Sequence, residues 1–380
     1  MTKKRVMIIA GEPSGDMQAS HLVKSLRAIN NHIEIFGVGG EKMKQSGVEI
    51  VYDIGGLAVV GFVEVIKHLR TFKKLFERLC SLLETKKPDA VVLVDYPGFN
   101  LRFARYAKSK NIPVIYYISP QVWAWGKDRL FEIKKYVDKM IVVFGFEEEL
   151  YKDFGIKAGF VGHPFLDIVR PGRKKEELIR ALHLSHHSAK ISLFPGSREK
   201  EIECHLPVML EACRLIKEKL PDAEFILSRC KEMDRAIYNK IISSSKIKPH
   251  SLENSPYDVM EISDMVIVSS GSATLETAIM EKPMVIIYKT SMITWLLARS
   301  MVKIPDIGLV NVVAGKRIVP ELIQFDANAV KIAKECLEIL NDKKRQENIK
   351  RELKKVKEKL GEQGAAERAA HIIQKFISSR

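Results

Sequence analysis

Two segments in the second half of the chain each place a glycine, small hydroxyl side chains and one charged side chain directly after an apolar run. The first reads Ile191-Ser-Leu-Phe-Pro-Gly-Ser-Arg198, and the second reads Met265-Val-Ile-Val-Ser-Ser-Gly-Ser-Ala-Thr-Leu-Glu276. We expect each to be a buried strand that turns at Gly196 or Gly271 into a helix. Such a turn binds phosphate, because backbone N–H groups and the positive end of the helix dipole meet at the end of the strand.

The charged residues of these turns favour a nucleotide as the ligand. Arg198 adds a planar cation to the first turn, and Glu276 adds a carboxylate that can accept hydrogen bonds from ribose hydroxyls. Glu276 could instead help to cap its helix, but with Ser272 as N-cap a capping box needs its acid at position 275, which is Leu275. Neither turn has the lysine of a P-loop, so γ-phosphate hydrolysis is not predicted. The predicted contacts are Gly196, Ser197, Ser270, Gly271, Ser272, Thr274 and Glu276.

Two segments of the first half carry acids after predicted strands. Gly11-Glu-Pro-Ser-Gly-Asp16 lacks the glycine fingerprint of dinucleotide-binding turns, but Glu12 and Asp16 could hold sugar hydroxyls. Asp95 follows the buried run Ala90–Val94, and burial there raises a carboxyl pKa toward neutrality, as a general base requires. The alternative is that Asp95 only caps the following helix.

A third segment, Ser119-Pro-Gln-Val-Trp-Ala-Trp-Gly126, follows the predicted strand Pro113–Ile118. Trp123 and Trp125 lie in the same loop, where they could stack on sugar faces, seat an acyl chain or pack at a domain edge. No Asp-x-Asp pair occurs in the chain, which disfavours a metal-assisted nucleotide-sugar transferase. In a metal-free design Arg198 and the helix amides would neutralise a leaving diphosphate.

The elements that position these residues alternate between strand and helix, which predicts an α/β fold with two parallel sheets. We expect a Rossmann-like domain over 1–165, a second over 174–340 facing the first across a cleft, and a helical tail over 341–380 that packs on the N-terminal domain or on a partner subunit. Predicted strands are Arg5–Ala10, Ile33–Val38, Ala90–Val94, Pro113–Ile118, Met140–Phe144, Ala158–Val161, Glu224–Ser228, Met265–Ser269 and Met284–Tyr288, with another beginning at Ile191. Predicted helices are Met17–Ile29, Phe99–Lys110, Glu147–Phe154, Glu201–Leu220, Asp234–Ser244 and Ala273–Met280. The apolar positions of the tail that must be covered are Ile349, Leu353, Val356, Leu360, Ala370 and Ile373.

Composition excludes several classes of protein. The 380 residues are 46% hydrophobic, so the chain is not disordered, and no apolar run is long enough for a membrane helix. The apolar start at Val6 is too short for a signal peptide and predicts a first strand. Five scattered cysteines fit a reducing cytoplasm. The net charge of +15 suits anionic lipid or phosphorylated substrates, and no RNA- or DNA-binding signature accompanies it; it could also be a lysine-rich surface alone.

The stretch Leu57–Leu79 has apolar residues at helical spacing with Lys67, Arg70, Lys73 and Lys74 between them. One interpretation is a helix that buries one face on a sheet. The other is a peripheral membrane contact, in which an apolar face rimmed by basic residues meets anionic lipid while Phe62, Val63 or Phe72 enters the interface.

The motifs together resemble the lipid A disaccharide synthases, bacterial glycosyltransferases of the GT-B fold. They run in order over nearly the whole chain and are listed here: Ala10–Asp16 (with Ser14 and Gly15), Val60–Glu64, Ser119–Trp125, Gly162–Pro164, Phe194–Arg198, Ser270–Glu276, and Asn311 in Leu309–Gly315. The resemblance implies transfer of a diacylated glucosamine from UDP-2,3-diacylglucosamine to 2,3-diacylglucosamine 1-phosphate (lipid X), in lipopolysaccharide synthesis at the inner face of a Gram-negative cytoplasmic membrane. It implies a β-1,6-linked product, inversion, no metal and no cofactor, with a possible homodimer. It also implies substrate contacts by Ser14, Gly15, Trp123, Trp125 and Asn311.

The catalytic base is assigned by the same comparison of motifs. In some relatives the segment after the buried strand Ala90–Val94 reads Asp-x-Pro-Asp-Phe-Asn, and its second Asp is a favoured base; here that position is Gly98. Asp95 is therefore the first choice as base, with Glu12 second. Three other functions remain as alternatives. The first is another GT-B UDP-sugar enzyme, either a UDP-N-acetylglucosamine transferase or a 2-epimerase. The others are a basic RNA-binding protein and a Rossmann oxidoreductase, which the turn Gly11–Asp16 disfavours.

Overall fold

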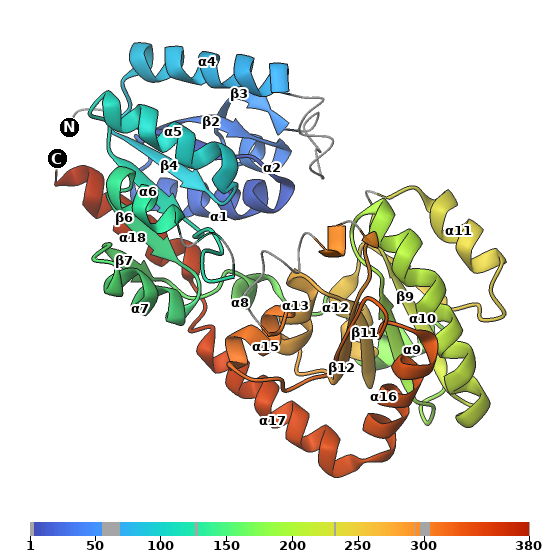
Figure 1. Cartoon of the computed structure of the whole chain (residues 1–380). Helices are drawn as coiled ribbons and strands as arrows, with labels where there is room; N and C mark the ends of the chain where they lie inside the picture. Colours follow the sequence, from blue (N-terminus) through green and yellow to red (C-terminus); the bar gives the residue numbers. More distant parts are fainter. Residues whose placement is uncertain are drawn as a thin grey trace. The chain divides into compact units, whose positions relative to one another are not determined.

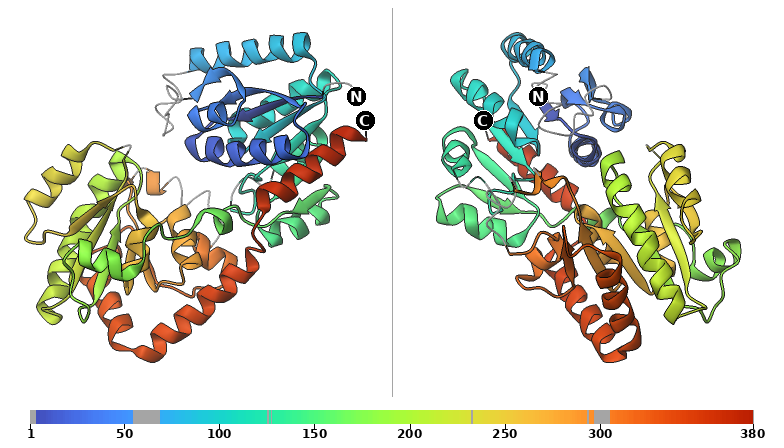
Figure 2. Two further views of the ribbon diagram at one scale, coloured as in Figure 1. Left: turned by 180° about the vertical axis from the view of Figure 1, so that it is seen from behind. Right: turned by 45° about the vertical axis from the view of Figure 1, so that its right-hand side comes forward.

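The computed structural model describes residues 4–54, 69–124, 126, 128–231, 233–292, 294–296 and 305–379. The chain forms two compact units, which we describe separately. Unit 1 contains Met1–Asp167 and Leu360–Arg380, and unit 2 contains Ile168–Lys359. Figures 1 and 2 show a twisted sheet with helices in each unit. Among the described helices, none is long and apolar enough to cross a membrane.

The described part of unit 1 has a seven-stranded sheet in the order β3-β2-β1-β4-β5-β6-β7, with every neighbouring pair parallel. The strands are β1 (Arg5–Ala10), β2 (Glu34–Gly39), β3 (Glu49–Asp53), β4 (Ala90–Val94), β5 (Val114–Tyr117), β6 (Lys139–Val142) and β7 (Ala158–Phe160). The central strand β4 is buried throughout, as expected when helices cover both faces of a sheet.

Helices cover the two faces of this sheet. They are α1 (Pro13–Ile29), α2 (Glu41–Gln45), α4 (Leu69–Lys86), α5 (Pro97–Ser109), α6 (Arg129–Tyr136), α7 (Gly145–Asp153), α8 (Phe165–Ile168) and α18 (Ala365–Ser378). Figure 1 shows α4 and α5 on one face and α1 on the other, and α18, from the end of the chain, packs against α1. Edge-to-face contacts of Phe76 with Phe99 and Phe103 join α4 to α5.

The described part of unit 2 has a six-stranded parallel sheet in the order β10-β9-β8-β11-β12-β13. Its strands are β8 (Lys190–Phe194), β9 (Glu224–Arg229), β10 (His250–Glu253), β11 (Met265–Ser269), β12 (Met284–Tyr288) and β13 (Glu321–Ile323). Its helices are α9 (Lys175–Ala181), α10 (Glu199–Lys219), α11 (Arg235–Ser243), α12 (Pro256–Ile262), α13 (Ser272–Ile279), α15 (Leu309–Ala314), α16 (Ala329–Asn341) and α17 (Lys343–Lys359).

Each sheet reverses its direction of winding once. In unit 1 the order changes between β1 and β4, and in unit 2 it changes between β8 and β11. In open parallel sheets, ligands bind at the carboxyl ends of the strands beside such a switch point. The topology therefore indicates that the residues following these four strands form the candidate ligand site.

The expected α/β class with two parallel sheets is confirmed, and most strand bounds differ from expectation by a residue or two. Several short elements had no periodic signal and were missed: β3, α2, α6, β10, α12 and β13. Helix α1 begins four residues earlier than the expected Met17, because Pro13 suits the first turn of a helix.

The structure divides the expected tail 341–380 near Leu360. Helix α17 packs against α13 and α15 of unit 2, whereas α18 packs against α1 of unit 1. The apolar positions expected to be covered are buried in this arrangement; they are Ile349, Leu353, Val356, Leu360, Ala370 and Ile373. The tail is thus two helices that belong to different units.

Candidate functional site

A glutamate that was not among the predicted site residues, Glu201, bonds to the turn after β8. Gly196 has a φ of +120°, and a Cβ there would lie 2.3 Å from Oε2 of Glu201, so only glycine fits. The Glu201 carboxylate accepts a hydrogen bond from the backbone N–H of Ser197 (3.1 Å) and pairs with Arg198 (2.9 Å). Arg198 precedes the first residue of α10, and its guanidinium is about half exposed. A cation and helix N–H groups therefore meet at the β8 end of the switch point.

A buried histidine, His205, bonds to the same turn. Nδ1 of His205 lies 2.8 Å from the carbonyl oxygen of Pro195, and its Nε2 accepts the backbone N–H of Lys289 (2.9 Å). Burial lowers the pKa of His205, which favours the neutral ring that this pairing requires. The ring thereby ties the β8 turn to the segment that follows β12.

The turn after β11 has open space around its glycine. Gly271 has a φ of +154° with no atom within 4 Å of a Cβ built there, and it is the N-cap of α13. Ser272 is therefore the first residue of the helix rather than its N-cap, which corrects the capping argument made from the sequence. Position N3 is then Thr274, whose hydroxyl donates to the carbonyl of Gly271 (2.8 Å). Ser270 lies just before the turn and donates to the carbonyl of Ile307 (3.1 Å).

The Glu276 carboxylate already takes part in two side-chain hydrogen bonds. Ser272 Oγ donates to its carboxylate at 3.1 Å, and Tyr257 from α12 forms a second side-chain hydrogen bond with it. Burial raises the pKa of Glu276, although both hydrogen bonds act against this shift. The carboxylate is held in a fixed direction one turn into α13, as a receptor for ribose hydroxyls requires.

Asn311 was expected to contact substrate, but its side-chain amide is fully used inside unit 2. Its Nδ2 donates to Glu321 (2.8 Å) and to the carbonyl of Val319 (3.0 Å), and its Oδ1 accepts the N–H groups of Ile318 and Val319. The side chain is 1% exposed. This geometry favours a structural role over the expected substrate contact.

In unit 1, Asp95 and Tyr96 leave β4 in the left-handed conformation, each with a φ of +47°. Side chains hold the carbonyl of Asp95 in place: Asn100 Nδ2 donates to it at 2.7 Å and Tyr116 Oη at 2.6 Å. Burial, with the negative charge of Glu12 adding to it, raises the pKa of Asp95 to about 6. No side chain caps the start of α5, so Asp95 does not have the capping role that was its alternative.

The turn after β1 separates two acids that the sequence analysis treated together. Glu12 and Ser14 are exposed, and Gly15 is buried against Ala10. Asp16 instead points away from the turn and caps α2: its carboxylate accepts the N–H groups of Gly40 (2.7 Å), Met43 and Lys42 (both 3.1 Å). The suggestion that Asp16 holds sugar hydroxyls is therefore corrected, because its carboxylate is buried and bonded to three backbone N–H groups of the segment Gly40–Met43.

The loop after β5 contains Trp123, which is half-buried and donates from Nε1 to Glu147 at 3.2 Å. Its ring lies edge-to-face on Phe146, with centroids 5.6 Å apart. Trp125 lies outside the described residues. Glu147 was missed from the sequence, because a glutamate near the start of a helix usually faces solvent.

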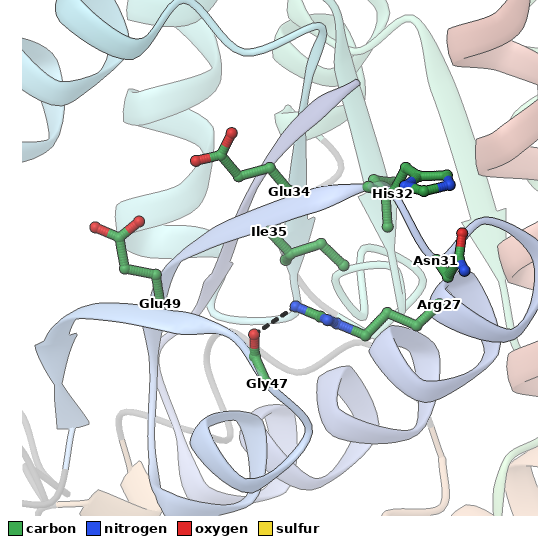
Figure 3. Close-up of a pocket in the computed structure, with 8 residues that line it drawn as sticks. Arg27, Asn31, His32, Glu34, Ile35, Gly47 and Glu49 are labelled. Atoms are coloured by element: carbon green, nitrogen blue, oxygen red, sulfur yellow. Dashed lines mark hydrogen bonds between the residues drawn. The ribbon is translucent and has the colours of Figure 1, made fainter. Parts of the chain in front are cut away.

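Unit 1 also has a pocket of about 390 Å³ at the opposite edge of the sheet, where β2 and β3 begin (Figure 3). Arg27 crosses it and donates to the carbonyl of Gly47 at 2.5 Å. Its two acids form ion pairs, Glu34 with Arg5 and Glu49 with Lys86. None of the residues predicted for chemistry lines this pocket. Among the described residues, no group of three or more His, Cys, Asp or Glu is arranged to hold a metal ion.

Comparison with known proteins gives one consistent result. The family model for lipid-A-disaccharide synthetase matches residues 6–376. A lipid-A-disaccharide synthase from Syntrophus aciditrophicus is 42% identical over 371 residues, which are 97% of each chain.

Solved structures at low identity share the fold. A putative UDP-N-acetylglucosamine 2-epimerase from Listeria monocytogenes matches with a TM-score of 0.67 at 15% identity, covering 100% of this chain and 98% of that one. A calicheamicin glycosyltransferase matches with a TM-score of 0.61 at 14% identity, covering 100% and 99%. These two likenesses concern the GT-B fold alone.

Proposed function

The chain belongs to the lipid-A-disaccharide synthetase family, and on that premise we propose that it is the UDP-sugar glycosyltransferase that makes the lipid A disaccharide. In the finer form of the proposal, 2,3-diacylglucosamine moves from UDP-2,3-diacylglucosamine to 2,3-diacylglucosamine 1-phosphate. The products are the β-1,6-linked disaccharide 1-phosphate and UDP. Inversion and independence of metal are part of the same proposal.

The pair of glycine turns at the switch point of unit 2 is the observation that supports a binding site for the UDP-sugar donor. Strands β8 and β11 are neighbours in the sheet, so the turns at Gly196 and Gly271 end side by side. The N-termini of α10 and α13 and the cation of Arg198 would bind the diphosphate, and Glu276 would accept the ribose hydroxyls. Since these groups can neutralise the leaving diphosphate, the scheme assigns no step to a metal.

The acceptor side rests on Asp95 at the switch point of unit 1. In a single displacement the acceptor's 6-hydroxyl oxygen forms a bond to the anomeric carbon as the bond from that carbon to the UDP oxygen breaks. The hydroxyl proton passes to the Asp95 carboxylate. A pKa of about 6 leaves Asp95 ionised at neutral pH and basic enough to accept this proton.

The direct test is to incubate the protein with both acylated substrates and to measure UDP release and the disaccharide product. We expect both to form at equal rates, and turnover to persist in EDTA. Product formation that stops in EDTA and returns with Mg²⁺ would remove the metal-free mechanism and leave the family assignment intact. The likeness to 2-epimerases is tested in parallel with UDP-N-acetylglucosamine alone, for which we expect no epimerisation.

We also propose peripheral association with an anionic membrane surface, because both substrates are acylated. In α4 the exposed residues Arg70, Lys73 and Lys74 support this. Phe72 was expected to enter the membrane interface, but it is half-buried and packs against the core of unit 1. Residues 57–68, with Phe62, Val63 and Lys67, lie outside the described residues. A homodimer stays a prediction that a solution mass measurement would test.

A further inference from the structure

Glu147 is a buried acid, 1% exposed, whose hydrogen-bond donors are all neutral groups. Its Oε1 accepts from Ser119 Oγ at 2.7 Å and from Trp123 Nε1 at 3.2 Å. Its Oε2 accepts from the backbone N–H of Phe144 at 3.3 Å. The backbone N–H of Val143 also donates to this carboxylate. A buried carboxylate is costly unless such bonds are made, so these bonds fix where the carboxylate lies.

These bonds connect the ends of two neighbouring strands. Ser119 and Trp123 follow β5, whereas Glu147 lies in the first turn of α7, which follows β6. Oε1 alone joins the two loops, since both of its donors come from the β5 loop. Phe146 adds an apolar contact to the ring of Trp123.

The chain between β5 and Ser119 is strained where this connection is made. Ile118 has a φ of +62°, a conformation that a β-branched residue rarely adopts. Such a residue persists only where its surroundings hold it, and strained residues cluster at functional sites. Ser119 is the next residue, and its bond to Glu147 is therefore placed to hold the strained turn.

The same edge of the sheet carries the proposed base. Strand β5 pairs with β4, and the backbone N–H of Asp95 donates to the carbonyl of Tyr117 at 3.2 Å. Tyr116 donates to the carbonyl of Asp95 from within β5. Displacement of the β5 loop would therefore act beside Asp95, where the acceptor hydroxyl must bind.

We propose that Glu147 is a positioning residue of the acceptor site: its carboxylate fixes the loop Ser119–Trp123, and so the indole of Trp123, against which the acylated sugar phosphate packs. This inference rests on the proposed function. Glu147 acts through Trp123 and touches no substrate itself. Burial raises the pKa of Glu147 to about 7, which is consistent with a carboxylate that no cation stabilises.

The kinetic test uses Glu147→Gln, which keeps the shape of the side chain. The amide presents one oxygen and one NH2 group, so it cannot accept at both ends, and at least one of the two loops loses its bond. We expect the KM for acceptor to rise about tenfold, with kcat within about threefold and the KM for donor unchanged. The matched control is Glu149→Gln, which removes the same charge from an exposed position of α7 and should change nothing. An unchanged KM for acceptor, or equal changes for both substrates, would overturn the proposal.

Two further variants keep the test valid if Glu147→Gln does not fold. Ser119→Ala and Trp123→Phe remove the same bonds from the other side, and each should raise the KM for acceptor. In the double variant Trp123→Phe with Glu147→Gln, the second change should add less than its effect alone, because both break one connection. Full additivity would contradict the connection.

A spectroscopic arm separates this inference from the proposed reaction. With Trp125→Phe and Trp295→Phe, the fluorescence reports Trp123 alone, since the chain has three tryptophans. Adding Glu147→Gln should shift the emission and increase quenching by acrylamide without substrate present. If wild-type protein releases no UDP while this change appears, the function is wrong and the positioning contact is right. An unchanged Trp123 signal overturns the contact whatever the activity.

Discussion

Asp95 and Glu12 follow neighbouring strands, β4 and β1, but Asp95 is half-buried whereas Glu12 is exposed. Burial and the charge of Glu12 raise the pKa of Asp95 to about 6. We therefore predict that kcat/KM falls about tenfold per pH unit below pH 6, as the base becomes protonated. Asp95→Asn should lower turnover by about 10²-fold or more, with UDP affinity unchanged in calorimetry. Near-normal turnover of this variant would move the role to Glu12.

Ionisation of Asp95, which activity requires, is predicted to lower the stability of the folded protein. Its pKa is raised from 3.8 to about 6 on folding, so between these values the folded protein holds a proton that the unfolded chain has released. Stability contributed by Asp95 falls as pH rises through this window, and above it the ionised carboxyl costs at most about 3 kcal/mol. Asp95→Asn should therefore raise Tm at pH 7.5 relative to wild type and give no such gain near pH 4. Equal Tm differences at both pH values would contradict the raised pKa.

Arg198 is held by Glu201 and remains half exposed, so a diphosphate can reach it. Arg198→Ala should lower kcat by about 10²-fold, because a charge that stabilises the leaving group is lost. Glu276→Ala should mainly raise the Kd for UDP. Arg214→Ala is the matched control, since Arg214 lies on α10, the helix that Arg198 precedes, and like Arg198 pairs with an acid three residues away. UDP should protect unit 2 from hydrogen exchange, and protection confined to residues 4–160 would contradict the assignment.

At the scale of elements, local patterns in the sequence predicted the strands and turns that position the candidate site. The glycine turns and Asp95 follow apolar runs, and such runs become buried parallel strands whose ends carry ligands. The partners of these residues were not predictable in the same way. Asp16 bonds to the start of α2 and Glu147 to the β5 loop, and each pair is separated by more than twenty residues. No local periodicity encodes such contacts, because tertiary packing selects them.

The apolar and the basic residues of helix α4 are predicted to have separate roles, so both interpretations of the stretch Leu57–Leu79 apply to this helix. Phe72, Leu75, Phe76 and Leu79 pack on the core, so their replacement would destabilise the fold. The basic rim is separable: Lys73→Glu with Lys74→Glu should reduce binding to anionic liposomes roughly tenfold or more in flotation, with Tm unchanged. Lys350→Glu with Lys354→Glu makes the same change of net charge on α17 and is the control. Equal losses in both variants would show that binding follows net charge and not α4.

At the scale of the whole molecule, the chain returns to unit 1 after completing unit 2. Helix α18 is joined to unit 1 by packing and by specific bonds. Its buried face includes Ile373 and lies against α1, while the backbone N–H groups of Gly364 and Ala365 donate to Asp167. Arg368 adds a bond to the carbonyl of Val161 at 2.9 Å. Unit 1 therefore depends on residues that follow unit 2 in the sequence.

This dependence predicts that the two units respond separately to cavities in their cores. Ile373→Ala should cost roughly 2–5 kcal/mol and speed hydrogen exchange in unit 1, while UDP still binds unit 2 with unchanged Kd. The matched variant is Ile332→Ala, a fully buried isoleucine of α16, which should loosen unit 2 and weaken UDP binding. If Ile373→Ala accelerates exchange equally throughout 168–359, the chain unfolds as one cooperative body. In that case the return of α18 stabilises the whole protein and not unit 1 alone.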